Sequence, residues 1–208
     1  MHRRFIKTHT PLDGISYFPS CEYLLAYRGP KGACFSRRNH LLNMQNPPDL
    51  PQLAADFNEG FRAWVEELFE PGAGGQRSLE AFIQHFCSFR NYQHLENFHF
   101  FHYSDVKTKL DAVVCRIAEK FGMKLAQNEV ARNDKAVSFD GKKKNASAFS
   151  PGTGKQPFKS DEVFFSSGKN NQWQGILNET ELDNYTRRLK ERLPSNEIQW
   201  LEKEVENT

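Results

Sequence analysis

Two short apolar runs, each ended by a cluster of polar residues, constrain the fold of this chain most. The run at residues 23–27 reads Tyr-Leu-Leu-Ala-Tyr and is followed at once by Arg28, Gly29 and Pro30. Apolar and aromatic runs of this length are typical of a strand buried on both faces of a parallel sheet. Because Pro is favoured in the first turn of a helix, a helix over residues 30–43 is expected to follow.

A second strand–helix unit is predicted further along the chain. Residues 98–103 form an apolar and aromatic run, followed by the capping signal Ser104-Asp105 and by apolar residues at helical spacing as far as Gly122. Strand followed by helix, when repeated, indicates a parallel sheet with right-handed crossovers. Further helices are expected over residues 49–70, 78–92 and 179–193. The predicted fold class is α/β, a three-layer parallel sheet flanked by helices, in a single domain over residues 1–208.

The charges are unevenly placed although the net charge is only +2, from 28 basic and 26 acidic residues. Residues 1–43 and residues 135–160 each carry an excess of five positive charges, so the two basic segments can converge on one anionic ligand or can be solvated faces. A nucleic-acid-binding protein usually shows a stronger overall bias, so no nucleic-acid partner is expected.

Several other classes are excluded by the pattern of apolar residues and cysteines. No apolar stretch approaches the ~18 to 20 residues that cross a bilayer, and no apolar leader segment is visible near Met1, so no membrane partner and a cytoplasmic location are expected. The four cysteines lie within apolar patterns without CxxC spacing and are predicted to be reduced core thiols. His99 and His102 are a candidate metal pair, but no third ligand lies at suitable spacing, so no metal is expected.

Arg28 and the helix after it form a candidate phosphate site. Ligands of open α/β sheets bind outside the carboxyl ends of the strands, and helix N-termini attract anions. Arg28 follows the strand directly, and Ser36 falls within the helix. The alternative is that Arg28 is only a solvated loop residue.

The residues around these two runs resemble the sulfotransferases that use 3′-phosphoadenosine 5′-phosphosulfate as donor. In that family one strand ends in Lys-x-His-x-Pro, as Lys7-Thr8-His9-Thr10-Pro11 does here. The next strand of the family ends in an Arg-x-Pro-x-Asp element with a Ser eight residues after the Arg. Arg28 and Ser36 keep that spacing, while Gly32 stands where the family usually has Asp. The resemblance implies a sulfotransferase fold like that of the P-loop nucleotide hydrolases.

The resemblance extends to nucleotide-binding elements later in the chain. His-Tyr-Ser-Asp-Val-Lys is similar to a family element whose Tyr approaches the adenine, which assigns that role to Tyr103. Ser138 and Phe139 match a Thr-Ser-Phe element beside the adenine. A family Phe-Arg-Lys-Gly lid that grips the 3′-phosphate is represented by Phe165 and the three residues after it, namely Ser166, Ser167 and Gly168. Trp173 follows as in the family's Gly-x-x-Gly-x-Trp, and residues 137–172 are expected to form a mobile lid.

By this resemblance the chain is an enzyme that transfers a sulfuryl group to a hydroxyl or amine of a small-molecule acceptor. His9 is the predicted general base and Lys7 stabilises charge on the leaving oxygen, while Arg28 and Ser36 hold the 3′-phosphate. No match is found to the family's Lys-x-Gly-Thr-Thr-Trp loop, which wraps the 5′-phosphosulfate. The chain is therefore expected to be N-terminally truncated or to work without that loop. The alternative is an inactive fragment, or a nucleotide-binding or structural protein without turnover.

Overall fold

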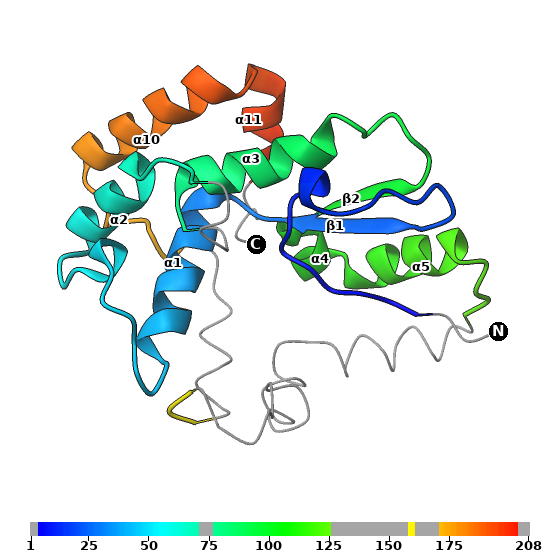
Figure 1. The fold of residues 1–208 in the computed structure, drawn as a ribbon, viewed down its shortest axis with the longest axis horizontal. Helices are drawn as coiled ribbons and strands as arrows, with labels where there is room; N and C mark the ends of the chain where they lie inside the picture. The colour runs from blue at the N-terminus through cyan, green and yellow to red at the C-terminus, as the bar shows by residue number, and fades with distance from the viewer. Residues whose placement is uncertain (1–3, 71–76, 126–157, 161–170, 204–208) are drawn as a thin grey trace.

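The structure, a computed structural model, describes residues 4–70, 77–125, 158–160 and 171–203. Within these residues two strands pair in parallel: β1 (Tyr23–Tyr27) and β2 (Phe98–His102). The register runs from Tyr23 opposite Phe98 to Tyr27 opposite His102, so both strands end at the same edge of the sheet. In Figure 1 the helix α3 (Leu79–Arg90) runs along one side of the strands, and α4 (Tyr103–Thr108) and α5 (Leu110–Lys120) along the other. The predicted α/β class with a parallel sheet between helical layers is confirmed.

The remaining helices surround the carboxyl ends of the strands or extend the core beyond α3. They are α1 (Pro30–Leu42), α2 (Phe57–Glu66), α10 (Glu179–Arg192) and α11 (Ser195–Leu201), with single 3₁₀ turns at Leu12–Gly14 and Pro51–Leu53. The predicted helices over 30–43, 78–92 and 179–193 are thus confirmed to within two residues at each end. Ser78 caps the start of α3, because its hydroxyl accepts a hydrogen bond from the Ala81 N–H at 3.2 Å.

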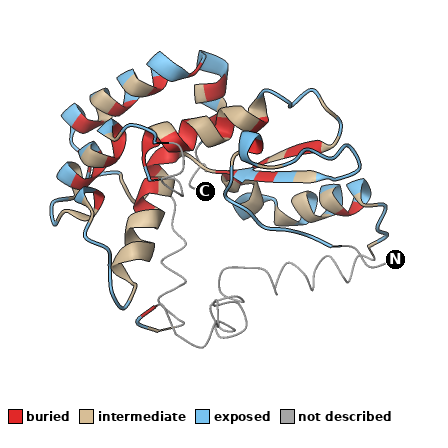
Figure 2. Ribbon diagram, viewed as in Figure 1, coloured by how far each residue is buried: buried red, intermediate tan, exposed pale blue. Residues whose placement is uncertain are grey.

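One large aromatic core joins α3 to the sheet and to the outer helices. The ring of Tyr27 lies 5.1 Å from that of Phe86 in α3, and Phe61 of α2 lies 5.8 Å from Tyr185 of α10. Figure 2 shows the buried residues gathered on the facing sides of α2, α3 and α10 and along the strands. Burial of these large side chains, at roughly 25 cal/mol per Å², stabilises the arrangement that brings α1, α4 and α11 together.

The prediction that residues 23–27 are buried on both faces is wrong. Leu25 and Tyr27 face α3 and are buried, whereas Leu24 is 45% exposed and Ala26 is exposed. On the opposite face α5 reaches β2, where Arg116 lies over the ring of Phe101 at 4.9 Å. No described helix covers the corresponding face of β1, so its alternate side chains remain in solvent.

The resemblance also implied a strand ending at Lys7-Thr8-His9, and this expectation is wrong. Residues 4–9 have no regular structure, and Phe5 and Ile6 are 95% and 92% exposed. A strand needs a hydrogen-bonding neighbour, and β1 has only β2 as partner among the described residues. The chain instead turns at Leu12–Gly14, where the Leu12 N–H donates to the Ser88 hydroxyl of α3 at 3.0 Å.

Two predicted helices differ from the structure at their boundaries. The helix expected over 49–70 is only α2, because Arg38 of α1 binds the carbonyls of Gln52 and Ala54 and holds that stretch out of a helix. The Asp56 carboxylate then caps α2, accepting from the Asn58 N–H at 2.7 Å. The helix expected after Ser104 is divided into α4 and α5 by Lys109, which adopts φ −138° and ψ 44°.

The cysteine prediction is correct in part. All four cysteines are free thiols, and Cys34 is buried in α1, where burial raises its pKa to about 12. Cys21 and Cys115 are exposed, so the expectation that they are core thiols is wrong. Cys21 lies in the turn before β1, and Cys115 lies on a solvent face of α5.

Candidate functional site

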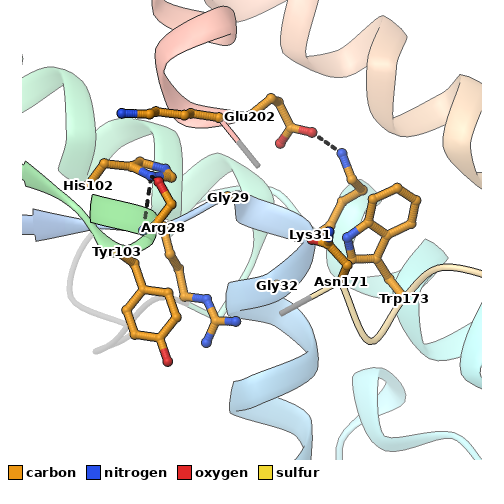
Figure 3. A pocket seen from close by; sticks show the side chains of 11 residues that line it. Arg28, Gly29, Lys31, Gly32, His102, Tyr103, Asn171, Trp173 and Glu202 are labelled. Carbon is orange, nitrogen blue, oxygen red and sulfur yellow. Dashed lines mark hydrogen bonds and ion pairs between the residues drawn. The ribbon is translucent and has the colours of Figure 1, made fainter. Parts of the chain in front are cut away.

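An open pocket lies at the carboxyl ends of β1 and β2, where α1 and α4 begin. Figure 3 shows its walls, which come from the end of β1, the starts of α1 and α4, the stretch around Trp173 and the turn after α11. The side chains that dominate it are Arg28, Lys31, Tyr103, Trp173, Glu202 and Lys203.

Arg28 projects from the end of β1 over the aromatic ring of Tyr103. Its guanidinium carbon lies 4.6 Å from the ring centroid, a cation–π distance. Burial lowers the pKa of Arg28 while Tyr103 opposes that shift, and the guanidinium keeps its positive charge. Gly32 makes room for this arrangement, because a Cβ there would lie 2.9 Å from Nη2 of Arg28. The two residues predicted to contact the nucleotide from separate strands therefore meet in one pocket.

His102, at the end of β2, holds two walls of the pocket together. Its Nδ1 accepts from the Ser104 hydroxyl at 2.6 Å and from the Ser104 N–H at 3.3 Å, which makes His102 the cap of α4 in place of the predicted Ser104. Its Nε2 donates to the Leu201 carbonyl at 3.1 Å. Burial lowers the pKa of His102, consistent with the neutral tautomer that this pattern requires.

The two histidines of β2 do not form the metal pair considered from the sequence. Residues three apart in a strand point to opposite faces, and His99 instead pairs with Glu22, with Nε2 and Oε2 2.6 Å apart. The described part of the chain contains no group of three or more His, Cys, Asp or Glu side chains suited to a metal ion.

A buried ion pair that the sequence analysis missed forms another wall. Lys31, 9% exposed, pairs through its ammonium with the carboxylate of Glu202. The Lys31 ammonium also lies 4.6 Å from the ring centroid of Trp173 and 4.8 Å from that of Tyr185. The Tyr185 hydroxyl donates to the second oxygen of Glu202 at 2.5 Å. Lys31 stands in the predicted helix N-terminus, but nothing in the local sequence around Glu202 indicates that it faces this pocket.

The predicted catalytic residues lie elsewhere. Lys7 and His9 are exposed on the irregular segment before Leu12 and do not line the pocket. His9 is close enough to His85 of α3 that its charge, after burial, helps lower the pKa of His85 to about 4. Nδ1 of His85 is 2.9 Å from the Tyr27 hydroxyl. His9 is therefore placed on the α3 side of β1.

The other predicted nucleotide-binding residues are placed as follows. Ser36 lies on α1, half-buried, and does not line the pocket. Ser138, Phe139 and the lid residues Ser166, Ser167 and Gly168 lie outside the described residues, as does most of the basic segment 135–160.

Comparison with known proteins identifies the family. A model of the sulfotransferase domain matches residues 1–197 of the chain. The chain belongs to the sulfotransferase domain family. Two curated relatives are glycolipid sulfotransferases, from Mycobacterium bovis (strain BCG / Pasteur 1173P2) and Mycobacterium tuberculosis (strain ATCC 25177 / H37Ra). Each is 28% identical, and the matched segments cover 96% of this sulfotransferase-family chain and 69% of the relative.

Two solved structures share the fold of this chain. A mouse sulfotransferase complexed with PAP matches with a TM-score of 0.70 at 16% identity, covering 87% of this chain. A retinol dehydratase in complex with androsterone and inactive cofactor PAP matches with a TM-score of 0.73 at 20% identity, covering 93%. This chain spans 61% and 54% of those two chains. In the described residues of this family member, no helix is long and apolar enough to cross a membrane.

Proposed function

We propose that the chain binds 3′-phosphoadenosine 5′-phosphosulfate and transfers its sulfuryl group to a hydroxyl or amine of a small acceptor in the cytoplasm. The observation that carries the proposal is the meeting of Arg28 and Tyr103 in one pocket, with the guanidinium 4.6 Å from the ring centroid. A planar, permanently charged guanidinium at a helix N-terminus suits a phosphate group, and an aromatic ring beside it suits an adenine.

In this proposal some residues hold the sulfuryl donor, and others accept the proton and stabilise the charge during transfer. Arg28, which lines the pocket, holds the 3′-phosphate, and the family resemblance adds Ser36 and the lid residues to this role, although Ser36 itself does not line the pocket. The acceptor oxygen attacks the sulfur, the bond from sulfur to the 5′-phosphate oxygen breaks, and the acceptor proton passes to the imidazole of His9. Lys7 stabilises the charge that develops on the leaving oxygen. Positioning and charge stabilisation are what such a transfer requires most.

The names of the relatives indicate which acceptor to test first. Both curated relatives are named glycolipid sulfotransferases, so the hydroxyl of a glycolipid is the first acceptor to test here. Phenols, simple alcohols and amines complete the panel, because the proposal requires only a nucleophile with a transferable proton.

One observation favours a second function, nucleotide binding without turnover. Lys7 and His9 do not line the pocket that contains Arg28 and Tyr103, and the segment that carries them has no regular structure. A protein with this geometry binds the nucleotide through Arg28 and leaves the sulfuryl group untransferred.

Calorimetry with adenosine 3′,5′-bisphosphate tests the binding step. Arg28→Ala should weaken binding by roughly 2 to 3 kcal/mol, the loss expected for a hydrogen bond to a charged group. Arg187→Ala, at an exposed pair with Glu191 on α10, should leave the affinity unchanged. If Arg28→Ala binds adenosine 3′,5′-bisphosphate with unchanged affinity, Arg28 does not contact the nucleotide. Adenosine 5′-monophosphate, which lacks the 3′-phosphate, should bind weakly to both proteins.

A transfer assay separates the two functions. Labelled 3′-phosphoadenosine 5′-phosphosulfate is incubated with the chain and the acceptor panel, and labelled product is counted. Product above the background of Arg28→Ala supports the transferase. Nucleotide binding without labelled product from any acceptor supports the second function.

A further inference from the structure

The ion pair between Lys31 and Glu202 places a negative charge inside a pocket whose other features attract anions. Glu202 follows α11, and its Oε1 lies 3.8 Å from the point where a Cβ on Gly29 would be. Gly29 caps α1 without a side-chain acceptor, so the first turn of this 13-residue helix has no side-chain cap of its own. The carboxylate therefore stands beside a helix N-terminus, where the helix dipole favours a negative charge.

The cations of the pocket are held differently. Lys203 pairs with Asp105 at 2.6 Å on the rim, while Arg28 faces the ring of Tyr103. Lys31 is the most buried of the three, and a carboxylate of the protein itself neutralises it. An anionic ligand that fills the pocket meets Lys31 and Glu202 together, so it gains from the ammonium only when the carboxylate withdraws.

We infer that Lys31 is an anion-binding residue of the pocket and that Glu202 competes with the ligand for it, so that the pair sets both the affinity and the charge preference of the site. The geometry supports an exchange rather than a fixed structural bridge. Glu202 lies at the end of α11 and remains 23% exposed at its side chain, while Lys31 is anchored on α1 between Trp173 and Tyr185. For a ligand to take its place, the carboxylate must leave both Lys31 and the Tyr185 hydroxyl, which donates to its second oxygen at 2.5 Å, while the ammonium remains between the two rings.

This competition determines which ligands enter. A neutral group that displaces the carboxylate removes a negative charge from beside the buried ammonium and supplies none in its place, which is costly. A phosphate or sulfate group replaces it charge for charge and adds further acceptor oxygens. The inference rests on the proposed function only for the identity of the nucleotide, because inorganic pyrophosphate can also bind Lys31 and would compete with Glu202 in the same way.

The test compares three variants by calorimetry with adenosine 3′,5′-bisphosphate and, separately, with pyrophosphate. Lys31→Met should weaken both ligands roughly tenfold or more, because a charge-assisted contact is lost. Glu202→Gln keeps the shape and removes the competing charge, and should tighten both by about three- to tenfold. In the Lys31→Met background, Glu202→Gln should change affinity less than about twofold, since nothing is left to compete for.

The matched control is Glu197→Gln. Glu197 of α11 pairs with Arg90 at 2.8 Å, and its side chain is 11% exposed against 23% for Glu202, but neither Glu197 nor Arg90 lines the pocket. This variant should leave both affinities unchanged. If it tightens binding as much as Glu202→Gln does, the effect is one of net charge and the inference is overturned.

Thermal unfolding keeps the inference testable if Glu202→Gln destabilises the fold by removing the negative charge beside Lys31. The variant should then gain more in Tm than the unaltered protein when pyrophosphate is added, because the ligand supplies the missing anion. An equal or smaller gain, unchanged or weaker binding by Glu202→Gln, or a gain that persists without Lys31, would each overturn the inference. Pyrophosphate binding through Lys31 without nucleotide binding would instead refute the proposed function and leave this inference standing.

Discussion

At the scale of single residues, the conformation of Arg28 in the pocket depends on which residue stands at position 32. Arg28 reaches the ring of Tyr103 across a space that stays open because residue 32 has no Cβ. The family's usual Asp at that position would place a carboxylate beside the same guanidinium. Gly32 therefore leaves Arg28 with an aromatic neighbour instead of an acidic one, which keeps its hydrogen-bond donors available for a ligand.

His9 carries the prediction about proton transfer. His9→Ala should lower turnover by ~10² to 10⁴ and leave the affinity for adenosine 3′,5′-bisphosphate nearly intact, because the imidazole acts on the acceptor rather than on the donor. The rate of labelled sulfate transfer and calorimetry are measured side by side. His94→Ala, at an exposed turn, is the control and should keep the full rate. A His9→Ala protein that transfers at full rate, or loses nucleotide affinity first, would contradict the assignment.

Asn171 carries a prediction about backbone conformation. The family pattern Gly-x-x-Gly-x-Trp puts its second glycine at this position, and Asn171 adopts φ 55°, in the left-handed region that Asn tolerates better than most residues. Asn171→Gly should change the free energy of unfolding by less than about 0.5 kcal/mol, whereas Asn171→Ala should lower it by about 1 kcal/mol. Urea unfolding at constant m-value measures both.

Gly175 provides the comparison for that series. It has φ 75°, and no atom lies within 4 Å of the position a Cβ would take. Gly175→Ala should therefore lower the free energy of unfolding through its backbone conformation alone. Its loss of stability should be similar to that of Asn171→Ala. A clearly larger loss for Asn171→Ala would mean that the Asn side chain, and not its φ angle, is what this position requires.

At the scale of elements, α11 closes the site from the far end of the chain. The Leu201 carbonyl accepts from Nε2 of His102, and Glu202 reaches the start of α1, so one short helix ties β2, α4 and α1 together. Leu201 is 0% exposed and anchors this helix in the core.

Leu201→Ala should therefore destabilise the protein by about 2 to 5 kcal/mol, the range for removing a buried Leu side chain. It should also weaken nucleotide binding, because the turn that carries Glu202 and Lys203 loses its anchor. Chemical denaturation and calorimetry measure the two effects. Leu24→Ala, at a side chain that is 45% exposed on β1, is the matched control and should cost much less. Equal losses for the two variants would show that α11 is not anchored through Leu201.

At the scale of the whole molecule, buried histidines make stability depend on pH. The pKa of His85 is lowered to about 4 by burial first and by the charge of His9 second, against about 6.5 in an unfolded chain. Between these values the unfolded state binds more protons than the folded state, so stability falls as pH falls from about 6.5 to about 4. Because His85 is only partly buried, its share of the loss should be about 1 to 2 kcal/mol.

Urea unfolding across that pH range measures the slope. His85→Asn keeps an acceptor for the Tyr27 hydroxyl and should reduce the slope without removing it, because the pKa values of His40 and His102 are lowered in the same direction. A His85→Asn protein with the full slope would assign the pH dependence to other groups.

Local patterns in the sequence determined the strands and helices, and they also determined that a residue able to bind an anion stands where β1 ends and α1 begins. The apolar runs at 23–27 and 98–103 became β1 and β2, Pro30 began α1, and the helices predicted over 78–92 and 179–193 formed as α3 and α10. These outcomes rest on interactions within a few residues of each position, such as caps and side-chain spacing, so the sequence contains them. The same holds for Arg28 at a strand end and for the family motifs around it.

Only the tertiary structure decided which residues share the pocket and which surfaces are covered. Glu202 meets Lys31 across 171 positions of the chain, and Trp173 and Tyr185 enclose that lysine from still other elements. Leu24 and Phe5 are apolar yet exposed, because burial depends on whether another element lies over them and not on their own hydrophobicity. Lys7 and His9 keep the family motif but do not line the pocket that contains Arg28. The reason is that packing on α3 sets the path of the chain from Lys7 and His9 to Arg28.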